Sequence, residues 1–166
     1  MKNILPKSAL ISLSDKTNLD LLVSFLLERN VEIISTGGTY KAIKKITNNV
    51  MEVSEYTGHK EMMGGRVKTL HPKIHAGILA RRGEDTDILK SMDYKEIDIV
   101  VVNLYPFEET INSGCSFEEA IEQIDIGGPT MIRAAAKNFK DVLVLSDPSD
   151  YEEMISEWDS KNGISY

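Results

Sequence analysis

The sequence predicts an α/β fold, a three-layer sandwich in which helices cover both faces of a mostly parallel sheet. Short, continuous apolar runs alternate along the chain with segments whose apolar residues recur at helical spacing. Continuous apolar runs are typical of parallel strands that are buried on both faces. Strands that alternate with helices form βαβ units with right-handed crossovers. Because 166 residues suffice for one sizeable core and are few for two, we expect a single domain over residues 1–166.

Each expected element follows from its local pattern. The first strand is an apolar run at residues 9–13, and leucines and a valine at helical spacing follow it. A β-branched run at residues 97–102 is the most strand-like segment of the chain. The other expected strands lie at residues 31–34, 50–53 and 142–145. The expected helices lie at residues 19–27, 40–46, 72–80, 85–92, 117–123, 129–137 and 151–158.

Composition and charge exclude several classes of protein. Hydrophobic residues make up 42% of the chain, with only 5 prolines and 11 glycines, which is unlike disordered or collagen-like sequences. The net charge of −7 repels polyanions, so we expect no nucleic-acid partner. No run approaches the roughly 20 apolar residues of a membrane span, and residues 1–7 lack the apolar core of a signal peptide. We therefore expect a cytoplasmic protein without a membrane partner.

Cysteine and histidine usage gives little indication of a metal or redox site. Cys115 is the only cysteine, which excludes an intramolecular disulfide and a cysteine zinc cage. His71 and His75 have the i, i+4 spacing that can bind a metal, but no third ligand is evident nearby. We expect these histidines to cap or pack, and we expect no metal site.

Two polar turns follow the first two predicted strands, and each opens a helix. Ligands of such sheets bind beyond the carboxyl ends of the strands. Free backbone N–H groups, glycines that allow close approach, and hydroxyl groups all favour a phosphate there. Simple N-capping is the alternative for either turn alone, whereas two such turns on adjacent strands favour the phosphate. Neither turn is a Walker or dinucleotide fingerprint. The candidate residues are Ser14, Lys16, Ser35, Gly37, Gly38 and Thr39.

A basic segment lies directly before the helix expected at residues 72–80. Arg66 and Lys68 are two residues apart, so in an extended segment their side chains face the same side. Arginine suits bidentate contact with phosphate or carboxylate, and a partly buried lysine can stabilise developing negative charge. A solvated basic loop is the alternative. Thr69 completes this segment as a candidate binding residue.

An amide and a phenol follow the strand expected at residues 97–102. Asn103 and Tyr105 would lie over the same sheet edge as the two polar turns, although core packing by Tyr105 and Phe107 is the alternative.

A carboxylate and an ammonium flank the helix expected at residues 129–137. Asp125 precedes Gly127 and Gly128 at the helix entry, and Lys137 lies at its exit. If the two converged on one site, they would form an acid/base pair. Taken alone, Asp125 would be an N-cap and Lys137 a partner of the helix dipole.

Together, in this order, the motifs closely resemble the N-terminal IMP cyclohydrolase domain of the bifunctional purine-biosynthesis family, AICAR transformylase/IMP cyclohydrolase. The resemblance covers roughly residues 9–151. It implies a methylglyoxal-synthase-like fold and a substrate, formamidoimidazole-carboxamide ribonucleotide (FAICAR), that closes with loss of water to inosine monophosphate (IMP). This ring closure needs no cofactor. The segments that carry the resemblance are Ser-Asp-Lys-Thr, Ser-Thr-Gly-Gly-Thr, Gly-Gly-Arg-Val-Lys-Thr-Leu-His-Pro, Asn-Leu-Tyr-Pro-Phe, Ile-Asp-Ile-Gly-Gly and Arg-Ala-Ala-Ala-Lys-Asn.

The resemblance also implies a role for each candidate. Asp125 would take the proton from the attacking carboxamide nitrogen, and Lys137 would protonate the formyl oxygen. Tyr105, with the backbone around Gly127, would support the tetrahedral intermediate, and Lys68 would assist charge stabilisation. The phosphate and ribose end would be held by Ser14, Lys16, Ser35, Gly37, Gly38, Thr39, Arg66 and Thr69, with Asn103, Gly127 and Gly128 completing the substrate site.

The chain departs from the family in one respect. Full-length members continue into an AICAR formyltransferase domain, which has no counterpart in these 166 residues, so we expect a fragment that does not make FAICAR. The full-length family is homodimeric, largely through that second domain, so a monomer or weak dimer is expected.

Two other functions share the implied fold. Methylglyoxal synthase is a phosphate-eliminating lyase, and the effector domains of carbamoyl-phosphate synthetase bind nucleotides without chemistry. The Arg-Val-Lys-Thr-Leu-His-Pro and Asn-Leu-Tyr-Pro-Phe segments favour the cyclohydrolase over the lyase. The joint presence of Asp125 and Lys137 favours catalysis over binding alone.

Overall fold

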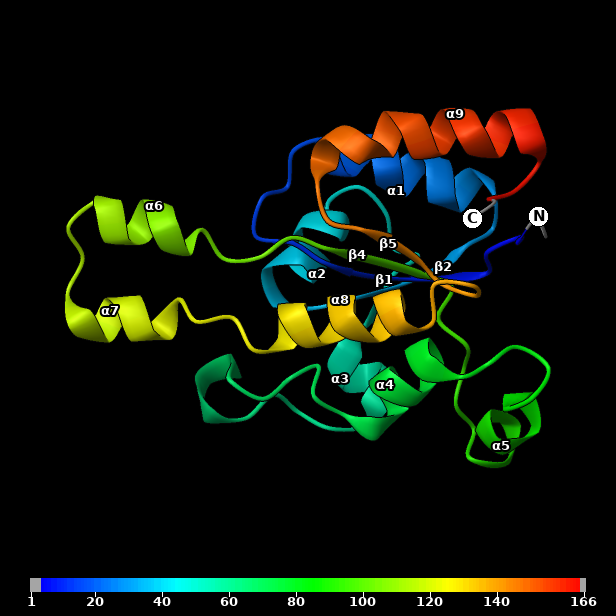
Figure 1. The fold of residues 1–166 in the computed structure, drawn as a ribbon, viewed down its shortest axis with the longest axis horizontal. Coiled ribbons are helices and arrows are strands. Elements are labelled where there is room, and N and C mark those ends of the chain that lie inside the picture. The colour runs from blue at the N-terminus through cyan, green and yellow to red at the C-terminus, as the bar shows by residue number, and fades with distance from the viewer. Residues whose placement is uncertain (1–3, 165–166) are drawn as a thin grey trace.

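A five-stranded parallel sheet forms the centre of the molecule. The computed structural model describes residues 4–164 (Figure 1). The strands pair in the order β3-β2-β1-β4-β5, and all four pairings are parallel. This architecture confirms the predicted α/β sandwich with a mostly parallel sheet. The strands are β1 (Ser8–Ser12), β2 (Glu32–Ser35), β3 (Met51–Glu52), β4 (Ile99–Val102) and β5 (Leu143–Leu145).

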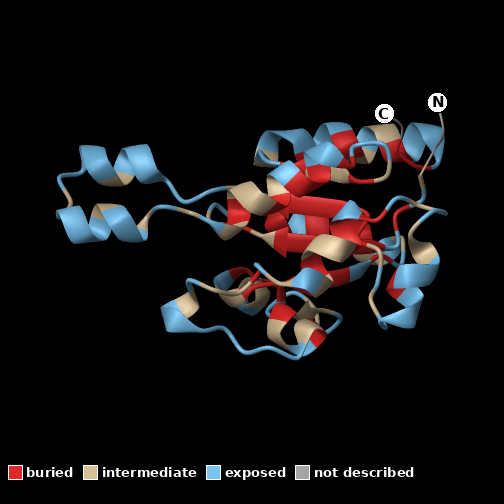
Figure 2. Cartoon of the chain, turned by 60° about the horizontal axis from the view of Figure 1, so that its bottom comes forward, coloured by how far each residue is buried: buried red, intermediate tan, exposed pale blue. Residues whose placement is uncertain are grey.

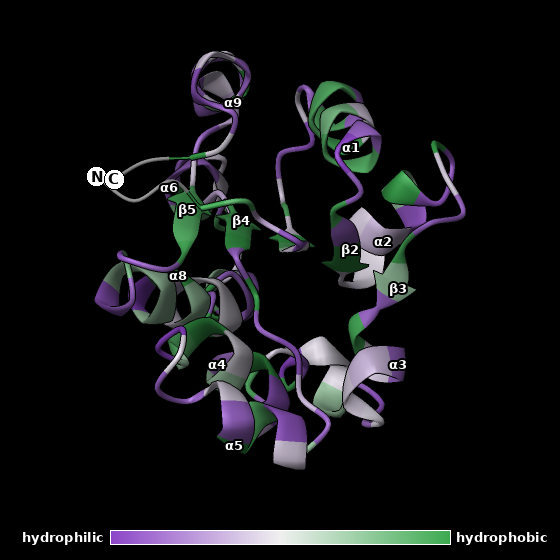
Figure 3. Ribbon diagram, turned by 90° about the vertical axis from the view of Figure 1, so that its right-hand side faces the viewer, coloured by the Kyte–Doolittle hydropathy of each residue, from purple (hydrophilic) through white to green (hydrophobic). Residues whose placement is uncertain are grey.

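Helices cover both faces of this sheet, as the end-on view in Figure 3 shows. Helices α1 (Leu19–Glu28) and α9 (Tyr151–Lys161) pack on one face. Helices α3 (Val53–Thr57), α4 (Pro72–Leu79) and α8 (Gly127–Lys137) pack on the other. The remaining helical elements are α2 (Gly37–Ile43), α5 (Thr86–Ser91), α6 (Phe107–Asn112) and α7 (Phe117–Glu122), with two short 3₁₀ turns at Met63–Gly65 and Pro148–Asp150.

The central strands divide their apolar side chains between two cores. Successive residues of a strand point to opposite faces of the sheet. Ile11 therefore packs with α1 and α9, whereas Leu10 packs with α4 and α8. All four residues of β4 are buried, which is why this run is apolar throughout. Within residues 4–164, no helix combines the length and the apolar character needed to cross a bilayer.

The sequence missed two features of the chain around the sheet. The third strand is shorter than predicted, and its expected last residue, Val53, instead begins α3. Helix α6 was not predicted; it pairs with α7 to form a hairpin at residues 107–122, which we call the arm. No residue of either arm helix is buried, and the arm projects from the body (Figure 2). The other predicted helices are present, with ends shifted by a few residues.

An ion-pair network fastens the amino-terminal ends of the central strands. The Arg82 guanidinium lies 3.0 Å from Asp98 Oδ1, and the backbone N–H of Lys7 donates to Asp98 Oδ2 at 2.8 Å. Arg82 also donates to the backbone carbonyl of Ala80 at 2.7 Å and to that of Ile97 at 2.8 Å. Because Asp98 is only 8% exposed, its charge depends on these partners.

We expect Asp98→Ala to lower the free energy of unfolding by about 2–4 kcal/mol, because the Arg82 charge and two backbone N–H groups lose their acceptor. Urea denaturation followed by circular dichroism measures the change. Asp87→Ala, at an exposed carboxylate on α5, is the matched control and should leave the unfolding midpoint in place. Equal midpoints for the two variants would contradict the structural role of Asp98.

Candidate functional site

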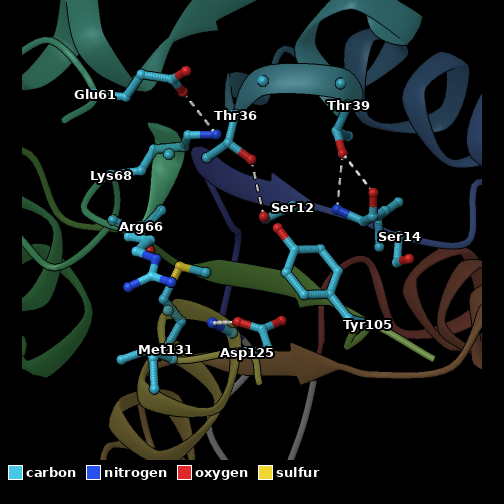
Figure 4. Close-up of a pocket in the computed structure, with 18 of the residues that line it drawn as sticks. Ser12, Ser14, Thr36, Thr39, Glu61, Arg66, Lys68, Tyr105, Asp125 and Met131 are labelled. Carbon is cyan, nitrogen blue, oxygen red and sulfur yellow. Dashed lines mark hydrogen bonds and ion pairs between the residues drawn. The ribbon is translucent and has the colours of Figure 1, made fainter. Parts of the chain in front are cut away.

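A cavity of about 650 Å³ opens at the carboxyl end of the sheet (Figure 4). Its walls come from the residues after β1, β2 and β4, from residues 61–70, and from the start of α8. The base of the arm adds Ile121 and Glu122. This is the edge at which parallel α/β sheets bind ligands, where the strand order changes direction between β1 and β4.

The two turns after β1 and β2 are tied to each other by side chains. Thr39 Oγ1 accepts from the backbone N–H of Leu13 at 2.8 Å and lies 2.9 Å from the Leu13 carbonyl, to which it donates. The hydroxyls of Ser12 and Thr36 are 2.9 Å apart. These bonds fix this wall of the cavity in place (Figure 4).

Asn103 joins the turn after β1 to the end of β4. Its Oδ1 accepts from the backbone N–H groups of Ser14 at 2.6 Å and Asp15 at 3.0 Å, and its Nδ2 donates to the Asp15 carbonyl at 2.7 Å. Both polar atoms of the Asn103 amide are therefore hydrogen-bonded to the turn after β1. Asn103 therefore shapes the site by holding this turn.

Three cationic side chains line the cavity. Lys68 pairs with Glu61 at 2.8 Å, and Arg66 pairs with Glu122. Lys16 Nζ instead donates to two backbone carbonyls of its own turn. The hydrogen bond and charge of Lys68 lower the pKa of Glu61, and those of Arg66 lower the pKa of Glu122, so both carboxylates are ionised at neutral pH.

The start of α8 brings a carboxylate into the cavity. Asp125 Oδ1 accepts from the backbone N–H of Gly128 at 2.8 Å. Within the part of the chain that the structure describes, Oδ2 accepts no hydrogen bond. A Cβ on Gly128 would lie 2.7 Å from that Oδ2 atom and equally close to Leu104 Cδ2, so a side chain at this position would have to displace the ends of both side chains. The carboxylate is thus held by one oxygen while the other stays free.

The structure brings together most of the residues that the sequence singled out. Tyr105, half exposed, stands beside the opening (Figure 4). The predicted residues that line the cavity are Ser14, Lys16, Gly37, Gly38, Thr39, Arg66, Lys68, Thr69, Asn103, Tyr105, Asp125, Gly127 and Gly128.

Two predicted residues lie outside the cavity. Ser35 is fully buried, and its hydroxyl donates to the Ile11 carbonyl at 2.8 Å, so its predicted contact with a ligand is wrong. Lys137 is the last residue of the 11-residue helix α8, about 15 Å along the axis from Gly127. The predicted convergence of Asp125 and Lys137 is therefore not seen in this cavity, which Lys137 does not line, and the catalytic role of Lys137 stays a prediction.

Sequence reasoning missed four polar residues of the cavity, which are Ser12, Thr36, Glu61 and Glu122. Thr36 lies within the recognised Ser-Thr-Gly-Gly-Thr turn, so its place beside Ser12 could have been inferred. No sequence pattern marks Glu61 or Glu122 as a cavity residue, because each is placed there by an ion pair with a cation elsewhere in the chain. The Arg66–Glu122 contact joins residues 56 apart in the chain.

The histidines act as the sequence predicted, by capping and packing. His71 is the N-cap of α4, with Nδ1 accepting from the backbone N–H of Lys73 at 3.1 Å. Burial lowers the pKa of both His71 and His75, so both are neutral at pH 7. Among residues 4–164, no group of three or more His, Cys, Asp or Glu side chains is arranged to hold a metal ion.

The fold and the cavity define a domain of the parallel α/β class, with cations and a carboxylate at the switch point of its sheet. Residues 19–130 match the MGS-like domain, and the chain belongs to this family. The fold implied by the sequence resemblance is thereby confirmed. The chain is also similar to ForH, a protein of known crystal structure. The two are 34% identical with a TM-score of 0.79, and the match covers 96% of this chain and 83% of ForH.

We expect Gly128→Ala to lower the free energy of unfolding by about 1 kcal/mol, because the added methyl group displaces the ends of the Asp125 and Leu104 side chains. Chemical denaturation measures the loss. Gly38→Ala is the matched control, since a Cβ there meets nothing within 4 Å, and it should cause no loss. The close fit around Asp125 would be refuted by a Gly128→Ala protein as stable as the unaltered chain.

Proposed function

We propose that the chain is an IMP cyclohydrolase, which closes FAICAR to inosine monophosphate with loss of water. One observation carries the proposal: a single cavity of an MGS-like domain contains cations beside a hydroxyl-rich wall and an Asp125 carboxylate with one free oxygen. In Figure 4, Thr36, Thr39 and Lys68 lie on one side of the cavity and Asp125 on the other. Cations and hydroxyl groups suit the phosphate and ribose of a ribonucleotide, and the carboxylate suits a proton transfer at its base.

The phosphate end of the substrate is assigned to the hydroxyl-rich wall. Lys68 Nζ lies 3.0 Å from where a Cβ on Gly37 would be, so the ammonium stands beside the turn that opens α2. Glycine at this position also has a φ of 42°, which side chains rarely adopt. A phosphate monoester bound here gains charge-assisted hydrogen bonds from Lys68 and Arg66.

The chemistry is assigned to the opposite side. Ring closure forms a bond between the carboxamide nitrogen and the formyl carbon, and the former carbonyl oxygen leaves as water. Asp125 Oδ2 is free to take the proton from the attacking nitrogen, while the bond from Gly128 to Oδ1 holds the carboxylate in place. Asp125 can then return this proton to the developing oxyanion, so that the oxygen leaves as water; Lys68 is committed to the phosphate end, and Lys137 does not line the cavity. The Tyr105 hydroxyl supports the same charge.

Both reacting groups are poor partners, so holding them together is a large part of the catalysis. Anchoring the phosphate fixes one end of the substrate, and the apolar side chains of Ile124 and Met131 line the cavity near Asp125. An anchored substrate places its two reacting groups next to the base. The rigid turns around the phosphate site, tied through Thr39 and Asn103, support this anchoring.

The lyase alternative finds less support in the cavity. Enolisation of a triose phosphate by a methylglyoxal synthase needs an active-site histidine as well as an aspartate. Within residues 4–164, no histidine lines the larger cavity, and the pKa values of His71 and His75 are lowered by burial. A domain that binds nucleotides without chemistry remains the alternative that the assay must separate.

We expect the purified chain to convert FAICAR to IMP, followed by ultraviolet absorbance, and Asp125→Asn to reduce kcat by about 10²–10⁴-fold, because the amide cannot act as the base. Asp87→Asn, on the remote helix α5, should retain full turnover. Binding of IMP by Asp125→Asn, measured by calorimetry, verifies that the site is intact. If the unaltered chain bound IMP but did not turn over FAICAR, the domain would be a binding module.

A further inference from the structure

Two carboxylates of the cavity take no part in the proposed ring closure. Glu61 precedes the 3₁₀ turn at Met63–Gly65, and Glu122 ends helix α7 of the arm. Both line the cavity, and each forms an ion pair with one of its cations, Lys68 or Arg66. Each of these cations therefore already has an anionic partner of its own.

The two ion pairs differ in burial. The side chain of Lys68 is 27% exposed and that of Glu61 is 54% exposed, and their atoms are 2.8 Å apart. The Arg66 and Glu122 side chains are both more than half exposed. Exposed ion pairs are weak because water and salt screen them, so the Lys68 pair is the stronger one. Both are weak enough for another anion to displace.

Lys68 is also the point at which two anions would compete. Its ammonium lies against the Gly37 backbone on one side and Glu61 on the other. Glu61 lines a second, smaller cavity of about 350 Å³ as well, together with Thr36, Gly37 and Lys68. A carboxylate that leaves Lys68 thus has space beside the main cavity to move into.

We propose that Glu61 and Glu122 are internal counter-ions, displaced by the phosphate group of the ligand, and that they make the site selective for phosphorylated over neutral ligands. This inference rests on the proposed function, from which we take the ligand to be a phosphate monoester. Such a group carries a charge of about −1.5 to −2 at neutral pH, so it competes well against a single carboxylate. A neutral nucleoside cannot break either ion pair and gains nothing from the cations.

A purely structural role for Glu61 and a counter-ion role predict opposite changes in phosphate affinity when Glu61 is removed. If Glu61 only held Lys68 in position, its removal would loosen the site and weaken phosphate binding. If it is a counter-ion, its removal frees Lys68 and strengthens binding. The sign of the change in affinity therefore distinguishes the two roles.

The test compares Glu61→Gln and Glu122→Gln with the unaltered chain by calorimetry, using inorganic phosphate, IMP and inosine as probes. We expect Glu61→Gln to bind phosphate and IMP about 3–10-fold more tightly, and Glu122→Gln about two-fold, with inosine unchanged. Glu118→Gln, which removes the same charge from α7 at a residue outside the cavity, should change none of the three affinities. In a Lys68→Met background, Glu61→Gln should give no gain.

Unchanged or weaker phosphate binding by Glu61→Gln would overturn the inference, and so would a chain that does not bind phosphate at millimolar concentration. An equal gain with Glu118→Gln would also overturn it, because the effect would then be one of net charge. The proposed function fails separately: if FAICAR is not turned over while Glu61→Gln still strengthens phosphate binding, the counter-ion role remains and the cyclohydrolase assignment is rejected.

Discussion

Burial of β1 and β4 between two layers of helices is the constraint on which the rest of the structure depends. Their side chains point alternately into two apolar cores, so neither strand can shift without exposing both faces. Since all strands are parallel, every loop that leaves a carboxyl end emerges at one edge. Asn103 then fastens the loop after β4 to that after β1. The cavity thus follows from the packing of the sheet.

Many of the polar side chains at this edge of the sheet form hydrogen bonds with the backbone of the protein itself. The Thr39 hydroxyl is used on both sides by Leu13, and the Ser35 hydroxyl is bound to a backbone carbonyl. Such groups have little capacity left for a ligand, although they stand in the motifs that suggested one. The proposed binding and chemistry therefore fall to a few side chains that the backbone does not fully engage, chiefly Lys68, Arg66 and Asp125. Turns held by hydrogen bonds around exposed ion pairs suit the proposed anion site.

The sequence predicted the parts of the protein that depend on local pattern. Apolar runs located all five strands, and the polar turns at their carboxyl ends located most of the cavity. The sequence could not predict features that depend on how residues distant in the chain, or at opposite ends of one helix, are placed in space. Lys137 follows Asp125 closely in the chain, yet a straight helix carries it away from the site. Helix α6 gave a weak signal because a short exposed helix has no apolar stripe to bury, and the Arg66–Glu122 pair joins segments that no local pattern connects.

The net charge of −7 and an anion site are compatible because the attraction is local. The arm at residues 107–122 contains five glutamates and no basic residue, but of these glutamates only Glu122 lines the cavity, where it pairs with Arg66. An anion beyond a Debye length of about 8–10 Å experiences little of the individual cations. It gains affinity only at contact with Lys68 and Arg66, where two carboxylates must first give way. The net negative charge of the chain and the two ion pairs together disfavour weakly charged ligands at the proposed anion site, so that discrimination precedes the proposed chemistry at Asp125.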